Sequence, residues 1–269
     1  MVARNRTDRV LIARCAAHVK WATVGDRSAA TAAARQAAVD RFEREVDPDG
    51  TLDPAERARR AATVDDWMVA TTSDPADDAL EALCDERGYR LFRGSVDDVL
   101  DRYHKAAVEA GADVVVRLTA DCPLLDPALV DLTVRAFLDA SPPADLVVNR
   151  LPGARTYPIG LDVEVVSFAA LERAWREAVE PHQREHVLPY LYDPPGRFRV
   201  IRLDADRDYG SLRWTVDTPE DLEFVRQVFA RLEGRGEFGW RDVLALVQAE
   251  PALAAINAGV RHKSHRDVG

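Results

Sequence analysis

The chain has 269 residues, of which 47% are hydrophobic and 30% charged, an ordinary balance for a globular protein with a sizeable core. Its formal net charge of −10 argues against the basic face that nucleic-acid binding requires. No apolar run reaches the ~18 residues of a membrane span, and the arginine-rich start lacks the apolar segment of a secretory signal. We therefore expect one cytoplasmic domain over residues 1–269, without nucleic-acid or membrane partners.

The three cysteines, Cys15, Cys84 and Cys122, lie far apart and form no CxxC pair. This spacing predicts neither a disulfide framework nor a zinc site. We expect all three to be buried thiols.

Residues 23–62 are rich in alanine and arginine and have a helical pattern, which predicts a helical insertion near the N-terminus. Within it, residues 45–56 also match the acid and glycine spacing of an EF-hand calcium loop. Two prolines in that loop oppose this reading, and Asp53 followed by Pro54 is a good helix start. A helix–turn–helix is therefore favoured, with a calcium module as the alternative.

From residue 66 onward, short β-rich runs alternate with helical patterns, which predicts an α/β fold with a mostly parallel sheet covered by helices. The expected strands are 67–72, a short run ending at 92, 113–119, 146–149 and 161–166, the last one half-buried. The expected helices are 77–87, 96–110, 127–140, 168–179, 219–232 and 240–248. Gly88 and Gly111 stand where a glycine would end the first two helices.

Two acidic turns follow apolar runs. Asp121 comes directly after the run 113–119, and Asp217 lies between the run 214–216 and the helix that begins near Pro219. The carboxyl ends of parallel strands face the ligand crevice, and two carboxylates suit Mg²⁺ together with phosphate oxygens and water. Either Asp alone could simply cap the next helix, but the pair favours a metal site.

Several ordered motifs resemble the cytidylyltransferases of spore-coat polysaccharide biosynthesis, relatives of the acylneuraminate and 3-deoxy-octulosonate cytidylyltransferases. They extend over roughly residues 66–260, and so many motifs in order are unlikely to agree by chance. The matching stretches are 92–103, 116–124, 155–158, 160–164, 184–187, 213–222 and, faintly, 256–257. The resemblance implies a Rossmann-like nucleotide-diphospho-sugar transferase fold and a CMP-sugar synthetase, which makes CMP-sugar and pyrophosphate from CTP and a sugar or sugar acid.

The same resemblance implies roles for particular residues. Asp121 and Asp217 would hold Mg²⁺ against the triphosphate, where the ion neutralises charge as pyrophosphate leaves. Arg93, Ser95 and Arg117 would lie near the nucleotide. The acceptor pocket would be lined by Arg155, Tyr157, Asp162, Glu164, Glu185 and His186. Members of the family are often dimers, so a homodimer is also implied.

Plainer readings exist for some of these residues. Asp162 and Glu164 alternate along a strand and could form its solvated face. Arg93 could belong only to a turn, although a guanidinium is also a good phosphate partner. His186 could be a satisfied core residue, but the charges beside it favour a polar pocket.

Family members open with a strand and then a phosphate-binding loop of the form Ala-Arg-x-x-Ser-x-Arg-Leu-Pro-Gly-Lys. The stretch from Ala3 to Val10 keeps the two arginines of this motif, Arg4 and Arg9. The resemblance implies that both arginines contribute to catalysis and that Ala3 and Arg4 contact the nucleotide. Leu11, Ile12 and Ala13 then stand where proline, glycine and lysine belong. Only two residues precede this stretch, too few for a first strand. The loop is therefore expected to be degenerate, and a non-enzymatic nucleotide-sugar-binding homologue is the alternative function.

Overall fold

The computed structural model describes residues 10–15, 66–232 and 238–261. The expected insertion at 23–62 and the alternative calcium loop at 45–56 lie outside these residues. The helices of the described part are too short or too polar to cross a bilayer.

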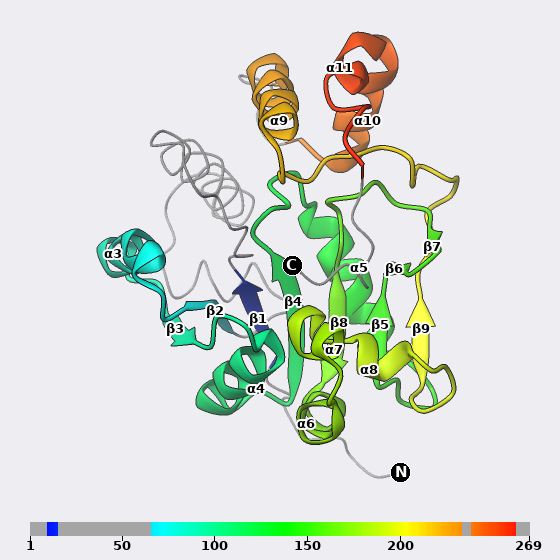
Figure 1. The fold of residues 1–269 in the computed structure, drawn as a ribbon. Coiled ribbons are helices and arrows are strands. Elements are labelled where there is room, and N and C mark those ends of the chain that lie inside the picture. Colours follow the sequence, from blue (N-terminus) through cyan, green and yellow to red (C-terminus); the bar gives the residue numbers. More distant parts are fainter. Residues whose placement is uncertain (1–9, 16–65, 233–237, 262–269) are drawn as a thin grey trace, which may run out of the picture.

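Seven strands of the described residues form one mixed sheet in the order β3-β2-β1-β4-β8-β5-β9 (Figure 1). Every neighbouring pair is parallel except the two pairs that β8 makes with β4 and β5. The strands are β1 Val10–Cys15, β2 Asp66–Thr72, β3 Leu91–Gly94, β4 Val114–Thr119, β5 Leu146–Val148, β8 Glu164–Ser167 and β9 Val200–Arg202. A separate hairpin pairs β6 Arg150–Leu151 with β7 Ala154–Arg155. The predicted α/β class and mostly parallel sheet are confirmed.

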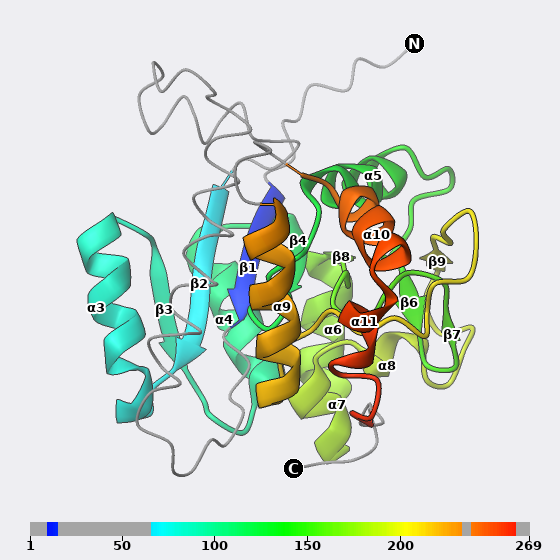
Figure 2. The same cartoon turned by 90° about the horizontal axis from the view of Figure 1, so that it is seen from above.

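Helices cover both faces of the sheet (Figure 2). They are η1 Pro75–Asp77, α3 Asp78–Arg87, α4 Val99–Ala110, α5 Pro127–Leu138, α6 Phe168–Glu177, α7 Pro181–His186, α8 Pro189–Tyr192, α9 Pro219–Leu232, α10 Trp240–Ala249 and α11 Pro251–Ala255. Gly88 and Gly111 end α3 and α4 in the left-handed conformation, as expected. Helix α4 begins later than predicted, because Asp98 caps it by accepting a hydrogen bond from the Asp101 N–H.

Strand β4 contributes to two cores because successive side chains point to opposite faces. Val114 and Val116 pack with α5, α9 and α10 on one face. Val115 packs with α4, α6 and α8 on the other. An uninterrupted apolar run is therefore the pattern of a strand covered on both sides.

Two sequence expectations need correction. The strand expected at 161–166 begins at Glu164, and it is buried rather than half-buried because it lies between β4 and β5 with helices on both faces. The first strand, expected to be missing, is β1 in the middle of the sheet, paired with β2 and β4. Leu11, Ile12 and Ala13 belong to this strand, so placing them in a phosphate-binding loop was wrong.

Candidate active site

The site is built where β4 ends. Asp121 lies in the turn after the strand, half-buried, and its carboxylate accepts a weak hydrogen bond from the Cys122 thiol, with 3.4 Å between Oδ1 and Sγ. Burial raises the pKa of Asp121, and the nearby carboxylates of Asp217 and Asp162 raise it further. An ionised Asp121 is thus disfavoured unless a cation lies beside it.

The segment from Arg213 to Asp217 is tied to the same turn. The Asp121 carbonyl accepts hydrogen bonds from the Val216 N–H at 2.8 Å and from the Thr215 hydroxyl at 3.1 Å. Among the described residues, this segment joins no sheet strand and makes one isolated bridge, between Arg213 and Ile159. The two aspartates therefore lie near each other, although only Asp121 follows a strand of the sheet, and their shared role as metal ligands stays a prediction.

Gly160 allows this close approach. Its φ is +101°, and a Cβ placed there would lie 2.5 Å from the Thr215 nitrogen and 2.6 Å from the Trp214 carbonyl carbon. Any side chain would push the segment that carries Asp217 away from residues 157–162.

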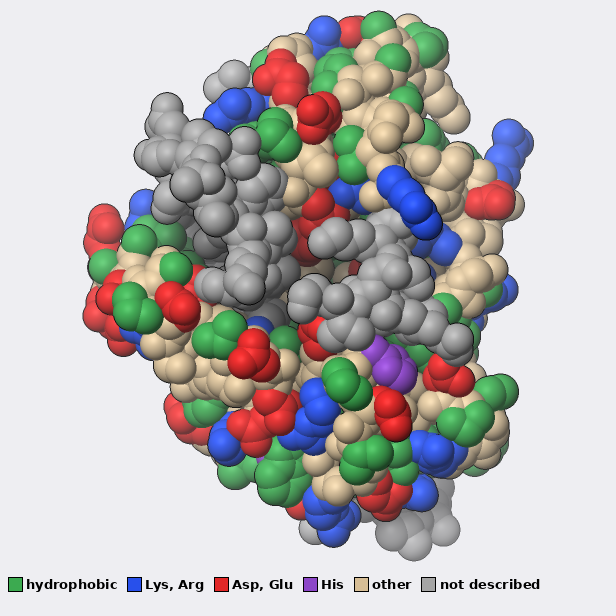
Figure 3. Space-filling model, viewed as in Figure 1, with side chains coloured by type: hydrophobic (Ala, Val, Ile, Leu, Met, Phe, Trp, Pro, Cys, Tyr) green, Lys and Arg blue, Asp and Glu red, His purple; other side chains and the backbone are tan. Residues whose placement is uncertain are grey.

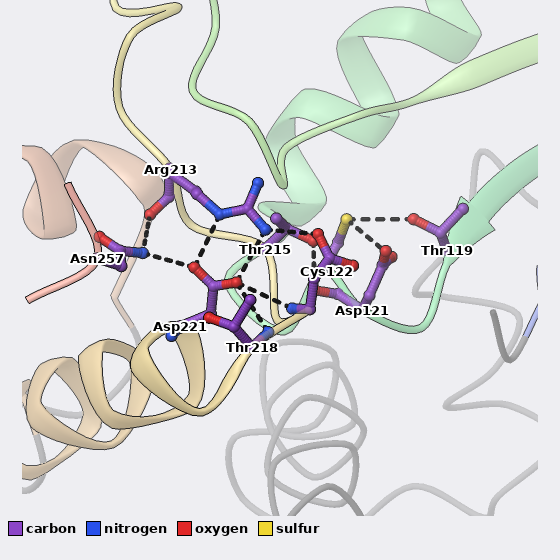
Figure 4. Close-up of polar contacts among 9 residues, drawn as sticks. Thr119, Asp121, Cys122, Arg213, Thr215, Thr218, Asp221 and Asn257 are labelled. Carbon is purple, nitrogen blue, oxygen red and sulfur yellow. Dashed lines mark hydrogen bonds and ion pairs between the residues drawn. The ribbon is translucent and has the colours of Figure 1, made fainter. Parts of the chain in front are cut away.

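Asp217 borders a network of charged and amide side chains, of which Arg213, Asp221 and Asn257 are seen in Figure 4. Its Oδ2 accepts a hydrogen bond from the Arg213 guanidinium at 2.5 Å, while its side chain remains 39% exposed. The same guanidinium is paired with Asp221, which is fully buried. Asn257 donates both to Asp221 and to the Arg213 carbonyl, at 2.9 Å each. Asp221 and Asn257, which the sequence did not single out as site residues, thus anchor Asp217.

The donor set is compatible with Mg²⁺ completed by a nucleotide. No group of three or more His, Cys, Asp or Glu side chains in the described part of the chain is arranged to hold a metal alone. Cys122 is no competing ligand, because burial raises the pKa of its thiol well above the usual value and keeps it protonated. Two carboxylates, with phosphate oxygens and water for the remaining positions, form a common Mg²⁺ environment.

Beside Asp121 and Asp217 lies a largely buried network of three arginines and two acids, namely Arg117, Arg150, Arg155, Asp162 and Glu164. Arg117, on β4, pairs with Glu164 on the neighbouring strand β8. Arg150 lies 3.2 Å from Asp162 and 3.6 Å from Glu164. Burial alone would lower the pKa of Arg150, but these two carboxylates raise it. Arg150 was not predicted, although it directly follows the expected strand 146–149.

The contacts of this network show that Asp162 and Glu164 do not form a solvated strand face. Asp162 accepts two hydrogen bonds from Arg155, one of them at 2.8 Å. The Glu164 side chain is only 3% exposed and that of Asp162 19% exposed, so neither belongs to a solvated strand face. Tyr192 lies near the network, because the charges of Arg150 and Glu164 both influence the pKa of its hydroxyl. Burial is the main cause that raises this pKa to about 12.

Arg93 and Ser95, predicted to contact the nucleotide, have structural partners. The Arg93 guanidinium donates to the Thr72 and Asp74 carbonyls and pairs with Asp78 and Glu81. It thereby fastens α3 to the end of β2. The Ser95 hydroxyl accepts a hydrogen bond from the Asp98 N–H at 3.0 Å. Their contact with a nucleotide stays a prediction.

The other residues predicted to line the sugar-acceptor pocket, Tyr157, Glu185 and His186, lie on opposite sides of the sheet. The Tyr157 ring packs edge-on against Trp240 in the core beneath α10. Glu185 and His186 end α7, half-buried on the opposite side, where Val187 has a φ of 73° and the Leu188 N–H donates to the His186 carbonyl at 2.9 Å. This is a strained γ-turn at a β-branched residue, which sequence patterns do not reveal. A pocket shared by all six residues therefore stays a prediction.

Ala3, Arg4 and Arg9 lie outside the described residues, and their roles stay untested. Because β1 begins at Val10, they precede a strand that the expected phosphate-binding loop should follow. In the space-filling view, several Asp and Glu side chains are exposed near the centre of the face (Figure 3).

Comparison with known proteins agrees with this architecture. The cytidylyltransferase family matches residues 53–241. An uncharacterized protein of Methanocaldococcus jannaschii is 35% identical over 79% of this chain and 85% of its own length. The spore coat polysaccharide biosynthesis protein SpsF of Bacillus subtilis is 32% identical over 71% of this chain and 78% of its own length.

A solved structure supports the same assignment. A cytidylyltransferase from Leptospira borgpetersenii has a TM-score of 0.72 and 25% identity, and the match covers 91% of this chain and 95% of that one. The CMP:2-keto-3-deoxy-manno-octonic acid synthetase complexed with CTP, at 16% identity and a TM-score of 0.53 over 83% of this chain and 99% of that one, shares the fold. The predicted resemblance is thus confirmed, and the chain belongs to the cytidylyltransferase family.

Proposed function

We propose that this protein transfers CMP from CTP to a sugar or sugar acid in a Mg²⁺-dependent step of polysaccharide or glycoconjugate synthesis, in the cytoplasm and as a homodimer. One observation carries the proposal: at the carboxyl end of β4 the Asp121 carbonyl accepts hydrogen bonds from Val216 and Thr215, the two residues before Asp217, and Asp217 is close enough to raise the pKa of Asp121. The choice of cytosine rests on the family and on relatives such as the CTP-bound synthetase.

The chain's own residues have distinct parts in this reaction. Asp121 and Asp217 would hold Mg²⁺, which supplies positive charge to the triphosphate. A hydroxyl oxygen of the sugar forms a bond to the α-phosphorus and loses its proton, while the bond to the β-phosphate breaks and pyrophosphate leaves. Burial raises the pKa of Asp121, which means that its negative charge is costly in the folded protein. A bound cation would offset this cost, so burial favours cation binding there.

The arginine and acid network is the proposed acceptor side of the site. Asp162 and Glu164 are held by Arg117, Arg150 and Arg155, so their carboxylate oxygens have fixed positions. Fixed carboxylates accept hydrogen bonds from sugar hydroxyls, while the guanidiniums favour an anionic acceptor. Arg155, Tyr157, Asp162, Glu164, Glu185 and His186 are proposed to line this side, and Arg93, Ser95 and Arg117 the nucleotide side.

The test is pyrophosphate release from CTP and Mg²⁺ with a panel of neutral sugars and sugar acids. Asp121→Ala and Asp217→Ala should each abolish release while leaving the melting temperature close to that of the wild type or higher. Asp131→Ala, on the exposed side of α5, is the matched control and should retain activity. Full activity in either site variant would remove that aspartate from the metal site. CTP binding without any release would favour the non-enzymatic homologue, and light scattering of the purified protein tests the dimer.

A further inference from the structure

The guanidinium of Arg213 contacts two carboxylates that differ in their burial. Its Nε and one Nη lie 2.8 Å from the two oxygens of Asp221, which is fully buried. The same Nη lies 2.5 Å from Oδ2 of Asp217, which is 39% exposed. Arg213 therefore makes a two-nitrogen contact with Asp221, seen in Figure 4, and a one-nitrogen contact with Asp217.

Asp221 has further partners that do not depend on the Asp217 carboxylate. It accepts hydrogen bonds from the backbone N–H groups of Asp217 and Thr218 at 3.0 Å each, and from Asn257 at 2.9 Å. These contacts fix Asp221 in place opposite Arg213. If the Asp217 side chain turned toward another cation, Arg213 would still have a buried counter-charge, and the large cost of an unpaired buried cation would be avoided.

We propose that the guanidinium of Arg213 takes the place of a divalent cation beside Asp217 in the metal-free protein. It neutralises this carboxylate when no divalent cation is bound and releases it when the metal and nucleotide arrive, while Asp221 retains the guanidinium. The inference rests on the proposed function, because it assumes that Asp217 is a metal ligand. Competition follows from geometry, since the Asp217 oxygen that contacts Arg213 cannot also coordinate a cation closely without the two positive charges repelling each other. Arg213 and Asp221 thus become positioning residues that set metal affinity.

Two substitutions in the same cluster should shift metal affinity in opposite directions. Arg213→Lys keeps the positive charge but lacks the planar fork, so its single ammonium should remain with buried Asp221 and leave Asp217 free. Because an ion pair with an exposed partner is weak, metal affinity should rise only about two- to fivefold. Asp221→Asn removes the competing carboxylate, so Arg213 should pair more strongly with Asp217 and metal affinity should fall by about fivefold or more.

The measurement is Mn²⁺ binding, followed by loss of the free-ion signal in electron paramagnetic resonance, with and without CTP, against protein-free CTP titrations. Opposite shifts for the two variants support the proposal. Shifts in the same direction, or none, overturn it and leave the proposed function standing. A wild type that binds no Mn²⁺ even with CTP overturns both. Asn257→Ala, which weakens the support of Asp221 without changing charge, is the control for general loosening. If Asp221→Asn does not fold, unchanged or weaker affinity in Arg213→Lys alone overturns the proposal.

Discussion

Replacing Glu164 by glutamine should lower the free energy of unfolding by about 2–4 kcal/mol, because it leaves buried arginines without a shared counter-charge. The Glu164 side chain is 3% exposed, its partner Arg117 is 12% exposed, and Arg150 lies 3.6 Å away and is 22% exposed. Removing one partner of a fully buried pair costs about 3–5 kcal/mol, and the lower figure here allows for the second carboxylate, Asp162, that Arg150 retains.

The assay is urea unfolding followed by circular dichroism, with thermal melting as a second readout. For a chain of this size, at about 2 °C per kcal/mol, the loss corresponds to a melting temperature lower by roughly 4–8 °C. Asp131→Asn breaks an exposed pair with Arg135 at 3.6 Å on α5 and should change the free energy by less than about 0.5 kcal/mol. A loss below about 1 kcal/mol for Glu164→Gln, or an equal loss in both variants, would refute the claim that this network is buried and stabilising.

Three further predictions follow from the site. Burial places the folded-state pKa of Asp121 above its unfolded value, so its ionised form destabilises the metal-free protein as pH rises above about 4. Asp121→Asn should therefore raise the melting temperature by a margin that grows above about pH 4 and levels off once pH exceeds the folded-state pKa, and a gain independent of pH would contradict the assigned pKa shift. Gly160→Ala should destabilise the fold by about 3 kcal/mol or more, because the added Cβ would lie 2.5 Å from the Thr215 nitrogen. Gly153→Ala is the control: Gly153 also has a positive φ but has open space around it, so the substitution should cost only about 1 kcal/mol. Equal losses in urea unfolding would show that the close approach at Gly160 is unimportant. Arg93→Gln should lower the melting temperature by loosening α3 and should also weaken CTP binding measured by calorimetry, because Arg93 is proposed to lie on the nucleotide side; a lower melting temperature with unchanged CTP affinity would leave Arg93 a structural role alone.

Local signals were enough for most of the fold. Apolar runs, helical periodicity and the glycines at 88 and 111 predicted five of the sheet strands and six helices between β2 and α10, but not β6, β7, β9, α7 and α8. Asp121 could be placed at the site because a carboxylate directly after a buried strand lies at the ligand edge of a parallel sheet. These features depend on neighbours in sequence, which is why they could be recognised.

Features set by distant contacts were missed or misplaced. Glu164 is buried because its strand lies between β4 and β5, an order that the alternation of residues 161–166 does not encode. Leu11, Ile12 and Ala13 were assigned to a loop because the arginines before them matched the family's phosphate-binding motif, although they form β1, which pairs with β2 and β4. Asp221 lies in the first turn of α9, where an acid is common, and its role as the buried partner of Arg213 depends on contacts that only the folded chain makes.

The proposed function requires Asp121 and Asp217 to bind CTP through a metal. The most direct test is calorimetric titration of the purified protein with CTP in the presence and absence of Mg²⁺, with ATP, GTP and UTP as controls. We expect binding of CTP that requires Mg²⁺ and is lost in Asp217→Ala. Binding of no nucleotide, or equal binding with and without Mg²⁺, would contradict the account.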